Sequence, residues 1–263
     1  MDSLPYFLIV RIFDELSLRD AIHASYASRQ WNLVLKRYLQ DRYNVNNYLC
    51  FPNPKAMLTV FRITGTILSG SRALAYFLPS HRKFTKSSDW DIFVPFPHQQ
   101  IVHDQLVSQG FLNVERIKPQ PKPDRFLVYD YFNAANAKIQ LVALKVHWSM
   151  YDNIMNFHKS TVQNIISGWG VYSIHWQETF NKSGWLAERL AKYPDYEKQQ
   201  IKEAKDIGGF TLKEWANTDA RKLVENVFVA YYGRRADNEG DAVGYLSFEK
   251  LKGELLAQVG QLN

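Results

Sequence analysis

The sequence is poor in cysteine, in long apolar runs and in excess charge of one sign. Its 263 residues contain one cysteine, Cys50. A disulfide within the chain is therefore impossible, and a zinc site built on two or more thiolates is excluded. Such cysteine usage is typical of a reducing compartment, so we expect a cytoplasmic or nuclear protein.

No run approaches the roughly 18 apolar residues that a membrane-spanning helix needs, so we predict no membrane association. The apolar stretch at residues 1–13 is interrupted by Pro5 and Arg11 and lacks the pattern of a signal peptide. The 32 basic and 26 acidic residues give a net charge of +6. That balance permits a phosphate-bearing ligand without requiring one.

One basic pair in the sequence is a candidate contact with nucleic acid. The basic pair Arg234 and Arg235 follows Tyr231 and Tyr232. Cations beside aromatic rings suit single-stranded nucleic acid. Cations at the end of a helix explain the same pattern, because they complement the helix dipole.

Apolar and aromatic residues are plentiful. Apolar residues make up 46% of the chain, which includes 16 Phe, 15 Tyr and 7 Trp. This composition supports a packed core and argues against general disorder. At about 150 residues per domain, the length allows one or two domains.

Residues 4–43 predict three helices, because their apolar residues recur at helical spacing. Asparagines and prolines between residues 44 and 56 then predict turns and a boundary. We divide the chain into a helical segment at 1–50, a core at 57–177 and a mostly helical region at 178–263.

The core alternates short helices with strands, which predicts an α+β fold with a mixed sheet flanked by helices. Its strand predictions include residues 90–94 and two strands, 126–132 and 138–145, joined by a hairpin at 133–136. Residues 160–167 predict a helix.

A glycine turn at Ser69-Gly70-Ser71 separates a predicted strand from a predicted helix. Such a turn leaves free backbone N–H groups at the positive end of the helix dipole, which suits a phosphate. Ser71 adds a hydroxyl donor. Arg72 either faces the same phosphate or lies on the helix surface.

Two aspartates, Asp89 and Asp91, begin the next predicted strand. Because side chains alternate along a strand, both carboxylates point to one face. Neighbouring carboxylates repel each other, and this makes them a natural seat for Mg²⁺. Mg²⁺ that bridges carboxylates and phosphates is the recurring arrangement for phosphoryl and nucleotidyl transfer. The alternative is that Gly70 only makes a turn and that the aspartates are solvated.

The stretches Leu68–Leu74 and Ser88–Val94 resemble the nucleotidyltransferase fold typified by DNA polymerase beta, and in particular a set of nucleotidyltransferase-like proteins of filamentous fungi. The resemblance covers roughly residues 60–175. It implies that Gly70 and Ser71 contact the phosphates of a nucleoside triphosphate. It also implies that Asp89 and Asp91 hold the metal.

The sequence departs from this family at the third carboxylate, which serves there as metal ligand and general base. Gln140 stands at the matching position on the strand 138–145. An amide cannot take up a proton or add negative charge. Asp130, on the preceding strand, either substitutes for it or is a lone polar residue at a strand edge. A protein that binds nucleotide without catalysis, a pseudoenzyme, is therefore a second possibility.

The N-terminal segment resembles the F-box, a helical module of about forty residues that begins with Leu-Pro and ends with an Arg-x-Trp pair, here Arg29 and Trp31. In that family the module docks on the Skp-type adaptor of a cullin ubiquitin ligase. The resemblance implies an adaptor whose core recognises a target. The alternative is a helical cap that packs on the core. The residues implied at the partner interface are Leu4, Pro5, Ile9, Ile12 and Phe13.

Overall fold

Helices and strands are mixed along the chain, and most strands join in one large sheet. The computed structural model describes residues 4–16, 18–42, 45–78, 88–114, 125–145, 149–187, 191–214, 226–231, 243–247 and 250–253. The α-helices are α1 (Tyr6–Glu15), α2 (Leu18–Ser25), α3 (Arg29–Arg42), α4 (Val45–Tyr48), α5 (Pro54–Thr64), α6 (Gly70–Phe77), α7 (Gln99–Ser108), α8 (Met150–Met155), α9 (Trp176–Phe180) and α10 (Pro194–Gly208). Two short 3₁₀ turns are η2 (Phe96–His98) and η3 (Ser160–Val162).

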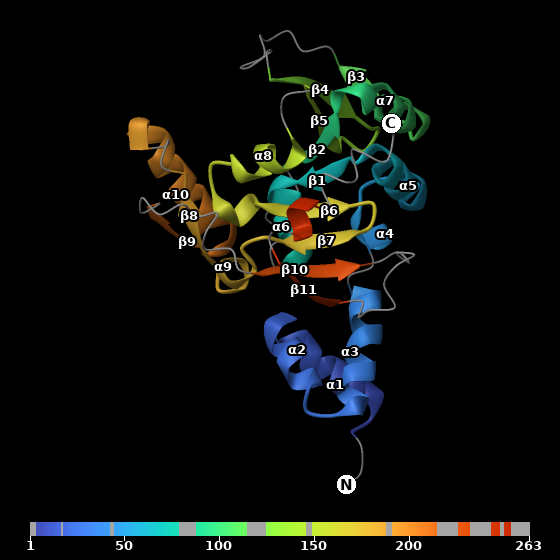
Figure 1. Cartoon of the computed structure of the whole chain (residues 1–263), viewed down its shortest axis with the longest axis vertical. Helices are drawn as coiled ribbons and strands as arrows, with labels where there is room; N and C mark the ends of the chain where they lie inside the picture. The colour runs from blue at the N-terminus through green and yellow to red at the C-terminus, as the bar shows by residue number, and fades with distance from the viewer. Residues whose placement is uncertain are drawn as a thin grey trace.

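The described strands form a nine-stranded sheet and a separate pair. The strands are β1 (Ile67–Ser69), β2 (Trp90–Pro95), β3 (Leu112–Val114), β4 (Phe126–Phe132), β5 (Lys138–Leu144), β6 (Asn164–Ser167), β7 (Gly170–Ser173), β8 (Ser183–Leu186), β9 (Thr211–Glu214), β10 (Asn226–Tyr231) and β11 (Val243–Ser247). The large sheet has the order β11-β10-β7-β6-β1-β2-β5-β4-β3 (Figure 1). Its strand pairs are antiparallel apart from β2 and β5, which run parallel.

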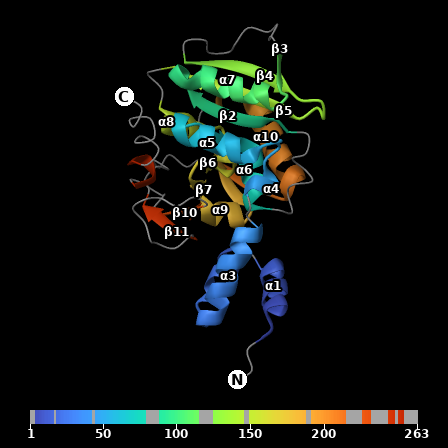
Figure 2. The same cartoon turned by 90° about the vertical axis from the view of Figure 1, so that its right-hand side faces the viewer.

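The sheet is covered differently on its two faces. Helices α5, α6 and α7 lie together on one face (Figure 2), where Leu68, Ile92 and Leu141 belong to the larger apolar core. On the other face α8 packs with the side chains that alternate with these, among them Phe93 and Val142. The face that α8 shares is therefore the one to which Asp91 and Gln140 belong, because side chains two positions apart point the same way.

Local sequence signals define the elements around the centre of the sheet. Helix α5 begins where the Asn53 side chain accepts a hydrogen bond from the N–H of Ala56, at 3.1 Å, and ends before Gly65 in the left-handed conformation. The β4–β5 hairpin closes where the Asn133 side chain accepts bonds from the N–H groups of Ala135 and Ala137. These contacts set where β1 and β5 begin.

The three N-terminal helices form a small unit that projects from the rest of the molecule (Figure 1). Their shared interior contains the fully buried Ile9 and Phe13. The Phe13 ring lies 5.7 Å from that of Trp31 and 5.4 Å from that of Tyr38, measured between centroids. Tyr38 also donates a hydrogen bond to Asp14 at 2.9 Å. The interior of this unit is continuous with the larger apolar core, and α3 and α4 lead from it to the sheet.

The α+β architecture with a mixed sheet and flanking helices is confirmed, as are three helices at the N-terminus and the hairpin at 133–136. No helix in the described parts of the chain combines the length and apolarity needed to span a membrane. The predicted basic pair Arg234 and Arg235 lies outside the described residues.

Two predictions of helix are wrong. The region 178–263, expected to be mostly helical, contains β8, β9, β10 and β11 beside α10. Strand β10 pairs with β7, so the sheet continues past the boundary drawn at 177. Residues 160–167 form the short turn η3 and then β6, where two β-branched isoleucines favour a strand. In both cases the segment is a strand because it pairs with a strand distant in sequence. The spacing of apolar residues within the segment does not reveal that pairing.

We predict that Phe13→Ala unfolds the N-terminal helices and spares the sheet. Removing a fully buried phenylalanine typically costs about 3–5 kcal/mol, which a unit of this size cannot absorb. Amide hydrogen exchange should then lose protection over α1 and α3. Loss of protection in β2 and β5 as well would contradict this prediction.

Candidate nucleotide and metal site

The glycine turn and the acidic strand meet at the centre of the sheet. Gly70 begins α6 directly after β1 and has a positive φ of 81°, which side-chain-bearing residues rarely adopt. A Cβ atom at this position would collide with the carboxylate of Asp91. The backbone of the turn therefore lies against that carboxylate, and only glycine permits the approach.

Cross-strand register places a row of polar side chains beside this turn. Asp91 pairs with Ser69 on one side and with Gln140 on the other, and Gln140 in turn pairs with Asp130. Residues in register lie on the same face of a sheet. The predicted metal ligand Asp91 and the residue at the third-carboxylate position are thus direct neighbours.

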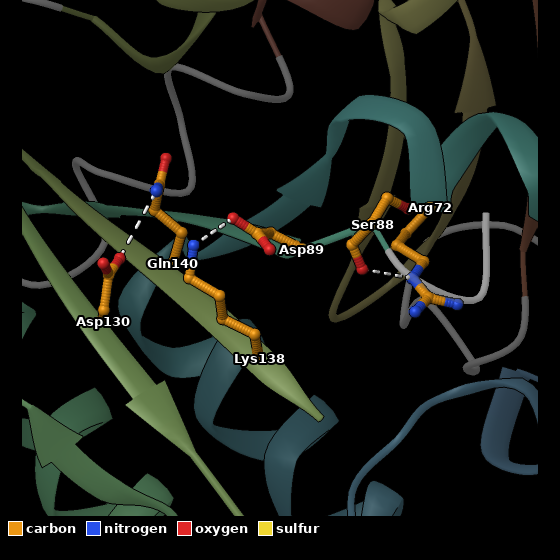
Figure 3. A network of polar contacts seen from close by, with 6 residues as sticks. All are labelled: Arg72, Ser88, Asp89, Asp130, Lys138 and Gln140. Carbon is orange, nitrogen blue, oxygen red and sulfur yellow. Dashed lines mark hydrogen bonds and ion pairs between the residues drawn. The ribbon is translucent and has the colours of Figure 1, made fainter. Parts of the chain in front are cut away.

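Asp89 is engaged by a lysine that the sequence reasoning missed. The Lys138 ammonium lies 2.6 Å from Asp89 Oδ2 and donates a hydrogen bond to it (Figure 3). Lys138 begins β5 two residues before Gln140, so the two side chains share a face. Because Trp90 pairs with Ile139, Asp89 falls beside Lys138. The sequence already places Lys138 and Gln140 on one face of the predicted strand. Only the register of β5 with β2 shows that Lys138 lies beside Asp89.

Gln140 is tied to the carboxylate beyond it. Its amide nitrogen donates to Asp130 Oδ1 over 3.4 Å (Figure 3). This contact leaves the amide oxygen of Gln140 as the atom that can accept a bond or bind a cation. Gln140 therefore stands between Asp130 and Asp91 in the row. Asp130 is not an isolated polar residue at the edge of the strand.

Arg72 contacts protein groups at the entrance to β2. Its Nε donates to the Ser88 carbonyl at 3.1 Å (Figure 3). Its guanidinium stacks over Trp90 at 4.7 Å from the ring centroid. The Tyr48 hydroxyl donates to the Arg72 carbonyl. Ser71, in the first turn of α6, is partly exposed. The contacts of Arg72 hold the segment leading to the two aspartates against α6 and α4.

The environment of Asp91 opposes its ionisation. Burial is the largest cause and the negative charge of Asp89 adds to it, while Lys138 acts in the opposite direction; together they raise the pKa of Asp91 to about 7. A carboxyl in this state accepts a proton readily near neutral pH. A cation bound beside it would restore the charged form.

The donor set suits one hard cation. Two carboxylates, with an amide oxygen beside them, offer oxygen ligands, and Mg²⁺ is commonly held by one or two carboxylates while phosphates and water complete its shell. No group of three or more acidic, histidine or cysteine side chains with metal-site geometry occurs in the described part of the chain. The residues therefore fit Mg²⁺ that arrives with a phosphate ligand better than they fit bare Mg²⁺.

The implied partner interface on the N-terminal helices needs correction. Ile9 and Phe13 are fully buried and belong to the core of this unit, so they cannot contact a partner. Leu4, Pro5 and Ile12 remain exposed. The exposed face of α1 also includes side chains that the pattern did not single out: Tyr6, Phe7 and Leu8.

Comparison with solved structures gave only distant likenesses. No family model and no curated protein sequence matches the chain. A solved structure of the Thermotoga maritima CCA-adding enzyme complexed with tRNA(CCA) aligns with a TM-score of 0.43 and 10% sequence identity. The alignment covers 65% of this chain and 41% of that enzyme, so this chain matches less than half of the enzyme's length. A likeness of this size says nothing of activity or substrate.

We predict that Asp91→Asn stabilises the cation-free protein at pH 8. The pKa of Asp91 is raised from 3.8 to about 7 by folding, so the folded state keeps a proton that the unfolded chain loses. The free energy of unfolding therefore falls as pH rises from about 4 to 7 and stays low above. The substitution should remove this loss, a gain on the order of a few kcal/mol.

Urea unfolding in EDTA at pH 5, 6, 7 and 8 measures the effect. The gain should shrink towards pH 5, where the native carboxyl is already protonated. The matched control is Asp104→Asn, which removes a carboxylate from the exposed surface of α7 instead of from β2. An Asp91→Asn protein no more stable than the wild type at pH 8 would refute the assignment.

Proposed function

We propose that the protein binds a nucleoside triphosphate together with Mg²⁺ and has the site of a nucleotidyltransferase. The N–H groups of the turn at Gly70 and Ser71 would hold phosphate oxygens, and Asp89 and Asp91 would hold the cation. Mg²⁺ would supply charge neutralisation at the phosphates.

The observation that carries this proposal is the contact between Gly70 and Asp91. Any phosphate bound by the turn would lie within reach of a cation on Asp91, because the backbone of Gly70 lies against the Asp91 carboxylate. A glycine turn alone or a pair of aspartates alone has many explanations. Their juxtaposition at one strand end has fewer, and it supports a site for a metal-bound polyphosphate.

The reaction that such a site supports is transfer of a nucleoside monophosphate to a hydroxyl acceptor. The acceptor must lose a proton, and Gln140 cannot take it. Asp130 is the next carboxylate along the row and contacts the Gln140 amide. We assign the role of general base to Asp130. It lies next to Gln140, which stands where the resembled family has its third carboxylate.

Binding is tested by thermal unfolding with each nucleoside triphosphate and Mg²⁺. A ligand at about 100 times its dissociation constant stabilises the native state by roughly 2.7 kcal/mol, which corresponds to about 5–10 °C for a chain of this size. We expect the wild type to show this shift. The Asp89→Ala/Asp91→Ala protein should not, because both cation ligands are gone.

Transfer is tested with α-labelled nucleotides and a panel of hydroxyl acceptors. Asp130→Asn should retain the thermal shift and lose the label transfer, which separates catalysis from binding. The matched control for binding is Asp104→Ala, which removes a carboxylate from α7. Absence of a thermal shift with every nucleotide in the wild type would refute the proposal.

A second function, that of an F-box-type adaptor, is favoured by the exposed face of α1. Phe7 has 61% of its surface exposed, and Leu4, Tyr6, Leu8 and Ile12 lie around it on the same short segment. Large apolar side chains gathered on one helix of a projecting unit are typical of a protein interface. We propose a Skp-type protein as the partner and the sheet domain as the part that recognises a target.

Copurification tests the adaptor function. Phe7→Asp places a charge in the centre of the exposed apolar face and should reduce Skp binding at least tenfold, with little effect on folding because Phe7 is exposed. The matched control is Ile101→Asp, an exposed apolar position on α7. Equal binding by the two variants, or none by the wild type, would contradict this function.

A further inference from the structure

Lys138 holds one of the two carboxylates that the proposed cation needs. Its ammonium lies 2.6 Å from Asp89 Oδ2, which is the distance of a charge-assisted hydrogen bond. In this arrangement Asp89 already has a cationic partner. A divalent ion approaching the same carboxylate meets the positive charge of Lys138 and must displace it.

The ion pair is placed so that it can open. The Lys138 and Asp89 side chains are 30% and 31% exposed, so water reaches both. Ion pairs at such positions contribute little to stability, because water and salt screen them and long side chains lose entropy in forming them. The ion pair is therefore weak and can open. It is not needed to hold β2 to β5, because a parallel ladder of hydrogen bonds already joins these strands.

The surroundings of Lys138 indicate what opens it. Its ammonium stands on the face of the sheet that carries Asp91 and Gln140, and Asp91 touches the Gly70 turn. A triphosphate on that turn brings several negative charges to the same face. A lysine with a flexible stem can turn from a carboxylate to a phosphate oxygen, since both are acceptors of its three N–H groups.

We propose that Lys138 is a positioning residue that couples nucleotide binding to cation binding. This inference rests on the proposed nucleotide function. Without nucleotide, Lys138 neutralises Asp89 and disfavours a bare divalent ion. When a triphosphate binds, the ammonium moves to a phosphate oxygen and Asp89 becomes free to bind the cation that accompanies the nucleotide. The site thereby selects metal-bound nucleotide over free metal.

The coupling makes one substitution act in opposite directions on two ligands. Lys138→Met removes the charge and keeps most of the apolar stem. It should tighten the binding of Mn²⁺, used as a probe without nucleotide, by about tenfold, because the competing cation is gone. It should weaken the binding of a non-hydrolysable nucleoside triphosphate in EDTA by about tenfold, because a phosphate partner is gone. A merely structural lysine would not shift the two affinities in opposite directions.

Electron paramagnetic resonance of free Mn²⁺ and calorimetry of the nucleotide in EDTA give the two affinities. Lys138→Arg should stay close to the wild type, since it keeps the charge. The matched control is Lys145→Met, just beyond the other end of β5, which should change neither affinity.

Tighter Mn²⁺ binding by Lys138→Met with weaker nucleotide binding in EDTA supports the inference. An unchanged Mn²⁺ affinity, including absence of binding by both proteins, overturns it. Proposed nucleotide binding is judged separately, by the thermal shift of the wild type with Mg²⁺ and nucleotide. If the wild type binds nucleotide and Lys138→Met leaves Mn²⁺ binding unchanged, the proposed function stands. The coupling role of Lys138 is then refuted.

Discussion

The close approach of the Gly70 backbone to the Asp91 carboxylate is the constraint on which the rest of the site depends. It needs a residue without a Cβ atom at Gly70, a left-handed backbone at the start of α6, and β1 antiparallel to β2 so that Asp91 lies beside Ser69. The approach covers part of the Asp91 carboxylate, which is half-buried. Burial is the largest cause of the raised pKa of Asp91, so a positive charge beside this carboxylate would favour its ionised form.

The surrounding residues respond to that demand in different ways. Lys138 brings a positive charge to Asp89, Gln140 offers an uncharged amide where a third carboxylate would add to the repulsion, and Asp130 is held one position further out. A row with fewer negative charges lying next to one another is easier to keep folded without a metal. Under the proposed function, the same arrangement lowers the affinity for a free cation and stabilises the protein in its absence.

How much of this could be predicted from sequence differs between the parts. The turn at Gly70 and the strand after Asp89 were predictable because each is encoded by neighbouring residues: a glycine between strand and helix patterns, and alternating side chains at 89–94. The partner of Asp89 was not, because Lys138 reaches it only through the parallel pairing of β2 with β5. Likewise, Ile9 and Phe13 follow helical spacing, but the side on which α3 packs decides that they face inward. The isoleucines of β6 show the same limit, since their strand exists through pairing with β1 and β7.

The pairing of β10 with β7 has a consequence for the unity of the chain. Strand β7 pairs with β6 on one edge and with β10 on the other, although residues 174–225 separate β7 from β10 in sequence. A protein ended after β7 would expose a row of unpaired backbone groups along that strand, and such edges invite association with other chains. The last strands therefore cover the edge of β7, and β11 takes its place as the edge on this side of the described sheet.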